Sequence, residues 1–458
     1  MEEKREYTGN NLTEGSVART LIMFSLPFIG AYLLQSLYSI ADMLVVSHLA
    51  GTYSASAVNI VGQISQVVLG IAVGFLSGST VVIAQYIGAG QEEKTEKAIE
   101  TAFAFVIIIS VLFTVGMLLF TDPLLKLLQT PEECYQEAWN YYVIYMAGTV
   151  FVFFYNAIAS VLRGMGDSKN PLIFVFISTF INIFLDILFV GPFQWGAGGA
   201  ALATIISQAV SVVIAILYLK RIDFSFDFKW RSYRIDKEQL KFIFQLGTPA
   251  ALQETLLNAS LVVLIGVANT LGVYASAAVG FGAKINVIFI LPVCALNASL
   301  ATMVGQNIGA GRMDRAMQAT KLELLYSAVY SAFICVIMWV FSKELLMFFT
   351  RDPQTLAVGA NYFKGHCWDY LLLMPIGYCF GGLFLGAGKS SYIAIANGCG
   401  ALISRIPLSI FLAHTMGLGV VGIGIAYTIS TLVTDLVYFI LYLKGDWKKS
   451  VIAEQSSV

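Results

Sequence analysis

The sequence predicts an all-α integral membrane protein whose twelve transmembrane helices form two pseudo-symmetric six-helix lobes. Three observations lead to this prediction. The chain of 458 residues is 58% hydrophobic and only 12% charged, with a mean hydropathy of +0.77, so it is far more apolar than an average soluble protein. Apolar stretches of about 20 residues, the length of a helix that crosses a bilayer, recur along the whole chain. The two halves of the sequence also match each other at a constant spacing.

Short polar segments separate the apolar stretches and give the expected limits of the helices. The predicted spans are 18–47, 55–86, 97–120, 136–162, 171–190, 199–220, 241–269, 276–307, 318–341, 357–385, 391–413 and 420–443. Pro27 falls inside the first span, where a proline removes one backbone hydrogen bond and permits a bend. It is therefore a candidate hinge, with a static kink as the alternative.

Lysine and arginine gather in the loops that follow even-numbered spans and are sparse in the other loops. The positive-inside rule then predicts a multi-pass protein of the inner (plasma) membrane with both termini in the cytoplasm. Residues 1–20 are mixed polar, so we expect no cleavable signal. The six cysteines lack metal-type spacing. A net charge of −1 argues against a nucleic-acid partner.

The internal repeat is visible in two motifs. Gly51-Thr-Tyr53 recurs as Gly272-Val-Tyr274, and Gln85-Tyr-Ile87-Gly-Ala-Gly90 recurs as Gln306-Asn-Ile308-Gly-Ala-Gly311, both 221 residues later. Six helices per repeat is an even number, so both halves enter the membrane from the same side and the repeat is parallel. We therefore expect an N-lobe at 1–220 with helices 1–6, a cytoplasmic linker at 221–240, and a C-lobe at 241–458 with helices 7–12, around a central cleft.

Isolated acids inside two apolar stretches are the strongest functional signal. Asp42 lies in the first span, and Asn182 and Asp186 lie four residues apart in the fifth, on one face of a helix. Ionisable groups in a bilayer are costly, face the protein interior, and usually mark an ion or substrate path. We hypothesise that these three residues form one intramembrane cation site. The second repeat carries apolar residues at the positions of both acids, so the site belongs to the first lobe, although a structural polar network is the alternative.

Further motifs are spread along the chain. They are Leu12-Thr13-Glu14-Gly15-Ser16 followed by Leu26-Pro27, the repeated Ile-Gly-Ala-Gly, Leu162-Arg163-Gly164-Met-Gly166-Asp167, Asn182-x-x-x-Asp186, and Gly199-Ala-Ala-Leu-Ala-Thr204. With these motifs the whole chain resembles a multidrug and toxic compound extrusion (MATE) transporter. It looks more similar to the bacterial and archaeal branch, which includes the DinF-like group, than to the eukaryotic branch.

The resemblance implies a secondary active antiporter rather than an enzyme. It would export organic cations, amphiphilic drugs or metabolites from the cytoplasm in exchange for Na⁺ or H⁺ by alternating access of the two lobes, without a cofactor. Its implied partners are a small-molecule substrate and the lipid bilayer, and the implied assembly is a monomer. The implied residues are Asp42, Asn182, Asp186, Thr204 and the backbone carbonyl of Ala200 for the cation, and Gln35, Tyr38 and Asn156 for the substrate.

The chemistry of these residues supports the implied cation site. Two carboxylates, an amide oxygen and a hydroxyl form an all-oxygen set suited to a hard cation such as Na⁺. Two carboxylates close together in a medium of low dielectric cannot both be ionised comfortably without a cation or a proton between them. The same site could therefore bind either ion, and the sequence leaves Na⁺ and H⁺ coupling open.

The second lobe has charges of its own. They are Glu254, Lys284, Asp369 and Arg405, with His366 one turn from Asp369. We interpret them as paired structural charges, with a second ion or substrate path as the alternative. A different function on the same architecture is a flippase for lipid-linked oligosaccharides, but only two cations, Lys284 and Arg405, lie clearly within spans.

Overall fold

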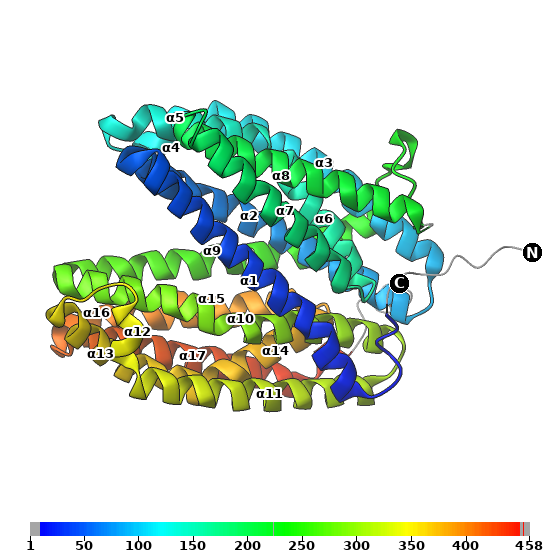
Figure 1. The fold of residues 1–458 in the computed structure, drawn as a ribbon. Coiled ribbons are helices and arrows are strands. Elements are labelled where there is room, and N and C mark those ends of the chain that lie inside the picture. Colours follow the sequence, from blue (N-terminus) through cyan, green and yellow to red (C-terminus); the bar gives the residue numbers. More distant parts are fainter. Residues whose placement is uncertain (1–9, 223, 449–451, 453–458) are drawn as a thin grey trace, which may run out of the picture. The chain divides into compact units, whose positions relative to one another are not determined.

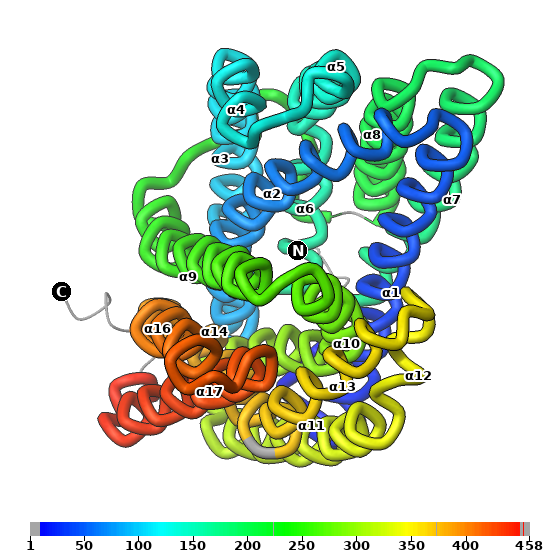
Figure 2. The backbone as a smooth tube through the Cα atoms, turned by 90° about the vertical axis from the view of Figure 1, so that its left-hand side faces the viewer, coloured from blue at the N-terminus to red at the C-terminus, as the bar shows by residue number. Residues whose placement is uncertain are grey.

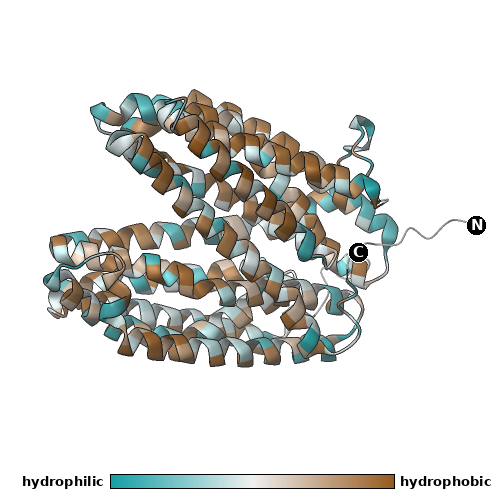
Figure 3. Cartoon of the chain, in the orientation of Figure 1, coloured by the Kyte–Doolittle hydropathy of each residue, from teal (hydrophilic) through white to brown (hydrophobic). Residues whose placement is uncertain are grey.

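The computed structural model describes residues 10–222, 224–448 and 452, and all regular elements among them are helices (Figure 1). Ten helices in this part of the chain are long and apolar enough to cross a membrane, and the number reaches 12 when each of two bent helix pairs counts as one span. Hydrophobic residues cover the middle of the long helices, and hydrophilic residues gather toward their ends (Figure 3). The predicted all-α membrane protein is confirmed.

The helices of the first repeat follow the predicted spans closely. They are α1 (Val17–Leu49), α2 (Gly51–Gly88), α3 (Glu92–Leu119), α4 (Thr121–Leu127), α5 (Glu132–Ala147), α6 (Thr149–Gly164), α7 (Lys169–Val190) and α8 (Gly196–Arg221), followed by a short 3-10 turn, η1 (Trp230–Ser232). The predicted span 136–162 is the pair α5 and α6, bent by 47°. The bend falls at Gly148, where an added Cβ would lie only 2.3 Å from the side chain of Ile205.

The second repeat has the same succession of long helices but less regular ones near its end. Its elements are α9 (Lys237–Thr270), α10 (Val273–Gly309), α11 (Met313–Val340), α12 (Ser342–Met347), α13 (Pro353–Trp368), η2 (Asp369–Leu373), α14 (Met374–Gly386), α15 (Ser390–Gly398), η3 (Cys399–Arg405), α16 (Ile406–Ile410), η4 (Phe411–Thr415), α17 (Gly419–Lys444) and η5 (Asp446–Lys448). Three of these, η2, η3 and η4, are π-helical. The bend of 46° between α13 and α14 coincides with η2.

Contacts divide the chain into two compact units. Unit 1 comprises Met1–Asn11 and Leu26–Gln245, and unit 2 comprises Leu12–Ser25 and Leu246–Val458. Each unit therefore takes in the opening stretch of the first helix of the other repeat, a detail that the expected division into 1–220 and 241–458 does not contain. The two changes of unit, in α1 and in α9, occur close to Pro27 and Pro249.

Within unit 2, the stretch that begins at Leu12 is held at the end of α10. The Leu12 backbone N–H donates to Oε1 of Gln306 (3.1 Å), and Nδ2 of Asn307 donates to the Leu12 carbonyl (3.2 Å). The guanidinium of Arg315 donates to the carbonyls of Glu14 (2.9 Å) and Gly15 (2.8 Å). The second copy of the repeated Gln-x-Ile-Gly-Ala-Gly motif thus binds the backbone of Leu12 through Gln306 and Asn307.

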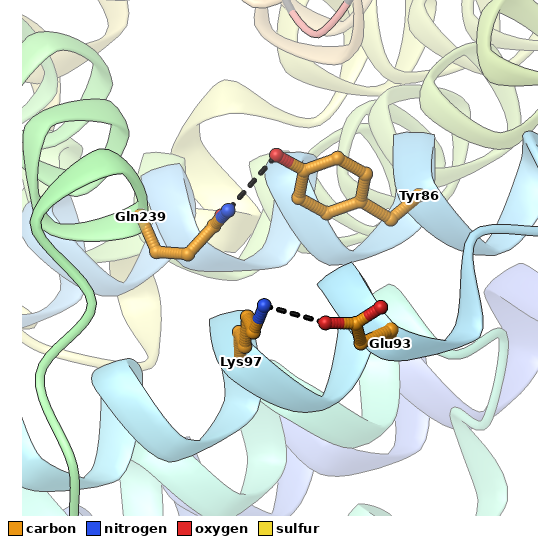
Figure 4. Close-up of polar contacts among 4 residues, drawn as sticks. All are labelled: Tyr86, Glu93, Lys97 and Gln239. Carbon is orange, nitrogen blue, oxygen red and sulfur yellow. Dashed lines mark hydrogen bonds and ion pairs between the residues drawn. The ribbon is translucent and has the colours of Figure 1, made fainter.

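Within unit 1, the start of α9 is held in a similar place, at the end of α2. Nε2 of Gln239 donates to the hydroxyl of Tyr86 (3.0 Å), one residue after Gln85 of the first motif (Figure 4). The Asp236 backbone N–H donates to Oγ1 of Thr101 (3.0 Å). Each unit therefore holds the opening stretch of the other repeat at the end of its own corresponding helix, α10 in unit 2 and α2 in unit 1.

Candidate functional site

Helix α7 carries Asn182 and Asp186 on its buried face. Asp167, one residue before the N-cap Ser168, accepts at Oδ1 from the backbone N–H groups of Lys169 (3.0 Å) and Asn170 (3.1 Å). Both site residues are fully buried. The opposite face is exposed and apolar, with Phe176, Phe180, Phe184 and Ile187. This inversion of the usual surface pattern is what a lipid-facing helix with an internal polar site requires.

Helix α1 carries Asp42 and runs beside α7 (Figure 2). Gly30 of α1 lies against α7, since an added Cβ there would be 3.2 Å from the side chain of Leu172. The hydroxyls of Tyr38 on α1 and Thr204 on α8 share a hydrogen bond of 2.8 Å. Asp42 follows Tyr38 by one turn and is buried on the same helix face. The carboxyls of Asp42 and Asp186 interact electrostatically, so the predicted trio lies together.

Helix α8 contributes the remaining predicted ligands. Thr204 and Ala200 lie one turn apart and are buried. Gly199 permits close packing on α7, because an added Cβ would lie 3.2 Å from Cβ of Phe189. The structure therefore places all five predicted cation ligands on three adjoining helices of unit 1.

Several polar atoms of this cluster have no hydrogen-bond partner among the described residues. They are Oδ1 of Asp42, both side-chain polar atoms of Asn182, and both carboxyl oxygens of Asp186. Buried polar groups are nearly always hydrogen-bonded, and leaving one unpaired costs about 1 to 3 kcal/mol. In the described chain no group of three or more His, Cys, Asp or Glu side chains could hold a metal ion. The donors are mixed oxygens with only two acids, which fits a monovalent cation or a proton.

Two tyrosines, Tyr38 and Tyr141, interact electrostatically with the acids, and the sequence analysis identified only Tyr38. Tyr38 was predicted as a substrate contact, yet its hydroxyl forms a hydrogen bond with the predicted cation ligand Thr204. Tyr141 and Tyr145 on α5 stack with ring centroids 6.0 Å apart, and Tyr141 interacts electrostatically with Asp42. Aromatic residues are common in apolar helices, so their position in the sequence did not distinguish these two.

The other predicted substrate contacts are more dispersed. Gln35 is exposed on α1, and Asn156 is partly buried on α6. Nδ2 of Asn156 donates to the carbonyl of Val152 (2.8 Å) in its own helix. The predicted hinge, Pro27, lies inside α1 directly after the residue at which that helix enters unit 1.

Unit 2 contains a second polar cluster, built on its irregular helices. Asp369 opens η2, and Arg405 closes η3. Arg405 donates from Nε to Oγ of Ser430 (3.0 Å) and from Nη1 to Oγ of Ser260 (3.0 Å), and its guanidinium lies 4.2 Å from the ring centroid of Tyr427. Arg405 acts electrostatically on Asp369 without forming an ion pair with it.

The interpretation of these charges as pairs is therefore wrong for the described residues. Neither of the two ion pairs found there includes Glu254, Lys284, Asp369 or Arg405. Lys284 is exposed and Glu254 partly buried. The Arg405 guanidinium instead donates hydrogen bonds to the hydroxyls of Ser430 and Ser260.

Two buried acids of unit 2 were not identified from the sequence. Asp435 on α17 is buried with both carboxyl oxygens unpaired among the described residues, and Glu323 on α11 is fully buried. Oε1 of Glu323 accepts from Oγ of Ser327 (2.7 Å). Each is an isolated acid in an apolar stretch, which is the same signal that identified Asp42.

Comparison with known proteins gives consistent results. The family model MatE matches residues 27–188 and 249–411, one segment in each repeat. The chain is 28% identical to the "Probable multidrug resistance protein YpnP" of Bacillus subtilis, over 96% of this chain and 97% of that protein. It is 27% identical to a "FAD transporter" of Shewanella oneidensis, over 81% of this chain and 80% of that protein.

Two solved structures share the fold. An outward-facing multidrug resistance MATE family transporter of the MOP superfamily has a TM-score of 0.88 at 24% identity, over 96% of this chain and 98% of that one. A MOP superfamily transporter from Pyrococcus furiosus has a TM-score of 0.90 at 23% identity, over 98% of this chain and 100% of that one.

Proposed function

This chain belongs to the MatE family of multidrug efflux transporters, and we propose that it exports organic cations, amphiphilic drugs or metabolites from the cytoplasm in exchange for Na⁺ or H⁺. It is a multi-pass membrane transporter and not an enzyme. The antiport would proceed by alternating access of an N-lobe at 1–220 and a C-lobe at 241–458, joined by the linker 221–240.

The observation that carries the proposal is the group of unpaired oxygens between α1, α7 and α8. Asp42, Asn182 and Asp186 are buried in unit 1 and offer oxygens that no other described residue satisfies. Such a set is costly unless a ligand completes it. A Na⁺ ion or a proton would neutralise the carboxylates, and the hydroxyl of Thr204 and the carbonyl of Ala200 would complete the coordination of Na⁺.

The coupling step in this proposal is a change in α1. Binding of the cation draws Asp42 toward Asp186, and α1 bends near Pro27 as a result. Each elementary charge that crosses the membrane supplies about 2.3 kcal/mol per 100 mV, which is enough to drive export against a gradient. Release of the cation on the cytoplasmic side would return α1 to its first position.

Substrate would bind along Gln35, Tyr38 and Asn156 in this scheme. Tyr38 would link substrate binding to cation binding, because its hydroxyl is hydrogen-bonded to the proposed cation ligand Thr204. The relatives are named for multidrug resistance and for FAD transport, which supports amphiphilic substrates that carry flat aromatic groups.

The remaining parts of the proposal concern the branch of the family, the assembly and the orientation in the membrane. We place the chain in the DinF-like bacterial and archaeal branch, as a monomer in the plasma membrane with both termini in the cytoplasm. The distribution of lysine and arginine supports this orientation, since they gather in the loops after even-numbered spans.

The test is efflux of a cationic dye from proteoliposomes with an imposed Na⁺ or H⁺ gradient. Wild type should respond to one of the two gradients, and Asp42→Asn and Asp186→Asn should each abolish the response because the ion loses a charged ligand. Asp122→Asn, at an exposed acid on α4, is the matched control and should transport normally. Full gradient-driven efflux in both site variants would remove the cation site and favour the flippase function.

A further inference from the structure

The segment between α8 and α9 folds into a small aromatic structure on the side of unit 1. We call residues 224–236 the aromatic knob. Phe226 is buried with its ring centroid 5.1 Å from that of Phe103 on α3, and Phe228 packs on the same ring at 5.6 Å. Tyr233 meets Phe226 edge to face at 5.1 Å. The knob is therefore attached to the body of unit 1 by a cluster of aromatic rings.

Hydrogen bonds fix the turn at the tip of the knob. Asp227 accepts from the backbone N–H of Lys229 (3.0 Å) and from the hydroxyl of Ser232, and it pairs with Nζ of Lys229 (2.9 Å). These interactions hold the pKa of Asp227 well below its usual range. At the far end, Asp236 caps α9 by accepting from the N–H groups of Glu238 and Gln239. The tip is thus a defined structure.

This defined turn presents a tryptophan to its surroundings. Trp230 is 85% exposed, and its neighbours Lys229 and Arg231 are exposed as well. Arg234 and Ile235 extend the exposed surface. Lys229 is neutralised by Asp227, whereas neither Arg231 nor Arg234 takes part in an ion pair among the described residues. The tip therefore combines one large amphipathic ring with two available guanidinium groups.

The corresponding region of the second repeat also packs an aromatic ring behind its last long helix. Trp447 also follows the last long helix of its repeat, but it is fully buried. Its Nε1 donates to the carbonyl of Tyr442 (3.0 Å), and its ring stacks on Tyr442 at 5.2 Å. At the repeat spacing of 221 residues Trp447 corresponds to Phe226, which is also buried, so Trp230 is an exposed ring outside this shared buried position.

The position of the knob indicates which kind of surface it contacts. Helices α8 and α9 are both long and apolar enough to cross a membrane, and the knob joins the end of α8 at Arg221 to the start of α9 at Lys237, which is where a membrane surface is expected. In Figure 1 it stands out to the side of unit 1 near the end of α8. Tryptophan is enriched at this level because its ring suits the boundary between acyl chains and headgroups. Arginine there attracts anionic lipids and binds phosphate oxygens in pairs.

We propose that the aromatic knob is a binding site for anionic phospholipid headgroups. The indole of Trp230 lies at the boundary between headgroups and acyl chains, and Arg231 and Arg234 bind the lipid phosphate. The ring cluster on Phe103 transmits this attachment to α3 and so fixes unit 1 in the plane of the bilayer. This site is separate from the cation cluster and does not depend on the transported substrate.

The first test locates Trp230 with brominated phospholipids, which quench tryptophan fluorescence on contact. The full-length protein and its Trp230→Phe variant are reconstituted in phosphatidylcholine brominated near the headgroup end of the acyl chain. The difference between their emission spectra isolates Trp230. We expect this difference signal to be strongly quenched. An unquenched signal would place Trp230 in water or against another protein and would overturn the proposal.

The second test measures headgroup preference. Brominated phosphatidylglycerol should quench Trp230 more effectively than brominated phosphatidylcholine. Arg231→Gln and Arg234→Gln together should remove the preference, with each arginine worth about fivefold in relative lipid affinity. The control removes two exposed lysines from the short helices α4 and α12, Lys126→Gln with Lys343→Gln, for the same change in net charge. Equal quenching by both lipids in the wild type, or an equal loss in the control, would refute the anionic preference.

Discussion

Units 1 and 2 are built from the same repeated sequence pattern, yet they treat buried charge in opposite ways. Unit 1 buries Asp42 and Asp186 in regular α-helices, and no buried lysine or arginine is found among its described residues. Unit 2 buries Arg405 together with Asp369 and Asp435. A buried charge is costly unless it is compensated, and among the described residues only unit 2 has a buried cation that acts on one of its buried acids. Under the proposed function, the first repeat would exchange the ion, and the second keeps a polar cluster around Arg405.

The two units also bend their middle helices by different means. The bend between α5 and α6 measures 47° and falls at Gly148, whereas the bend of 46° between α13 and α14 occurs through the π-helical η2. Gly148 permits close packing at a break between two α-helices, while a π-helical turn keeps the chain helical with a wider hydrogen-bond spacing and is frequent at functional sites. The position of Asp369 at the start of η2 therefore links the bend in unit 2 to its polar cluster.

The largest effect that distinguishes the units is expected from removal of the buried cation. Arg405→Met leaves the acids of unit 2 without compensation and should lower the free energy of unfolding by about 3 to 5 kcal/mol. Asp186→Asn in unit 1 removes a repulsive charge and should leave stability unchanged or higher, although transport is lost. Thermal unfolding of both variants in detergent measures the difference. Partial rescue of Arg405→Met by Asp369→Asn should follow, and a loss below about 1 kcal/mol for Arg405→Met would contradict the comparison.

The next effect concerns the glycine bend of unit 1. Gly148→Ala places a Cβ within 2.3 Å of Ile205 and should destabilise the protein by about 1 to 3 kcal/mol through overpacking. Ile205→Ala should relieve the clash in the double variant, so the two changes should be strongly non-additive in a double-mutant cycle. Gly266→Ala on α9 is the control, because no atom lies within 4 Å of its added Cβ. Additive effects of the two changes would show that the bend does not depend on this contact.

A smaller effect separates ion binding from structure. Tyr38→Phe removes the hydrogen bond to Thr204, worth about 1 kcal/mol, and should raise the ion concentration for half-maximal transport about fivefold. Tyr370→Phe in unit 2 removes a comparable bond to Asn286 and should change stability without changing ion affinity. Transport titrations of the two variants at several ion concentrations test this. Equal ion affinities for both would place Tyr38 outside the cation site.

Some of these features follow from local sequence, and others depend on packing that a single sequence does not reveal. The spans and the acids Asp42 and Asp186 were predictable, because length and hydropathy define a membrane helix and a lone charge stands out within it. Asp435 and Glu323 carried the same signal and were overlooked. The π-helical segments were not predictable, since they depend on a shift in hydrogen bonding that amino-acid propensity does not encode. The exchange of residues 12–25 was also hidden, because contacts decide which unit a segment joins.

The smallest predicted effect tests the repeat at equivalent positions outside the membrane helices. Helix α13 is capped by Asp352, whose Oδ2 accepts from the backbone N–H of Thr355 (2.7 Å), whereas α5 begins after Pro131 with no side-chain cap. The bonds from Thr355 lower the pKa of Asp352 below its usual value. The stabilisation is therefore fully present above the ordinary aspartate pKa of about 3.9 and is lost as the pH falls through the lower folded pKa. Asp352→Ala should destabilise the protein at neutral pH and much less in strong acid, whereas Pro131→Ala should show no such pH dependence. Unfolding measured across this pH range would contradict the assignment if the cost of Asp352→Ala were the same throughout.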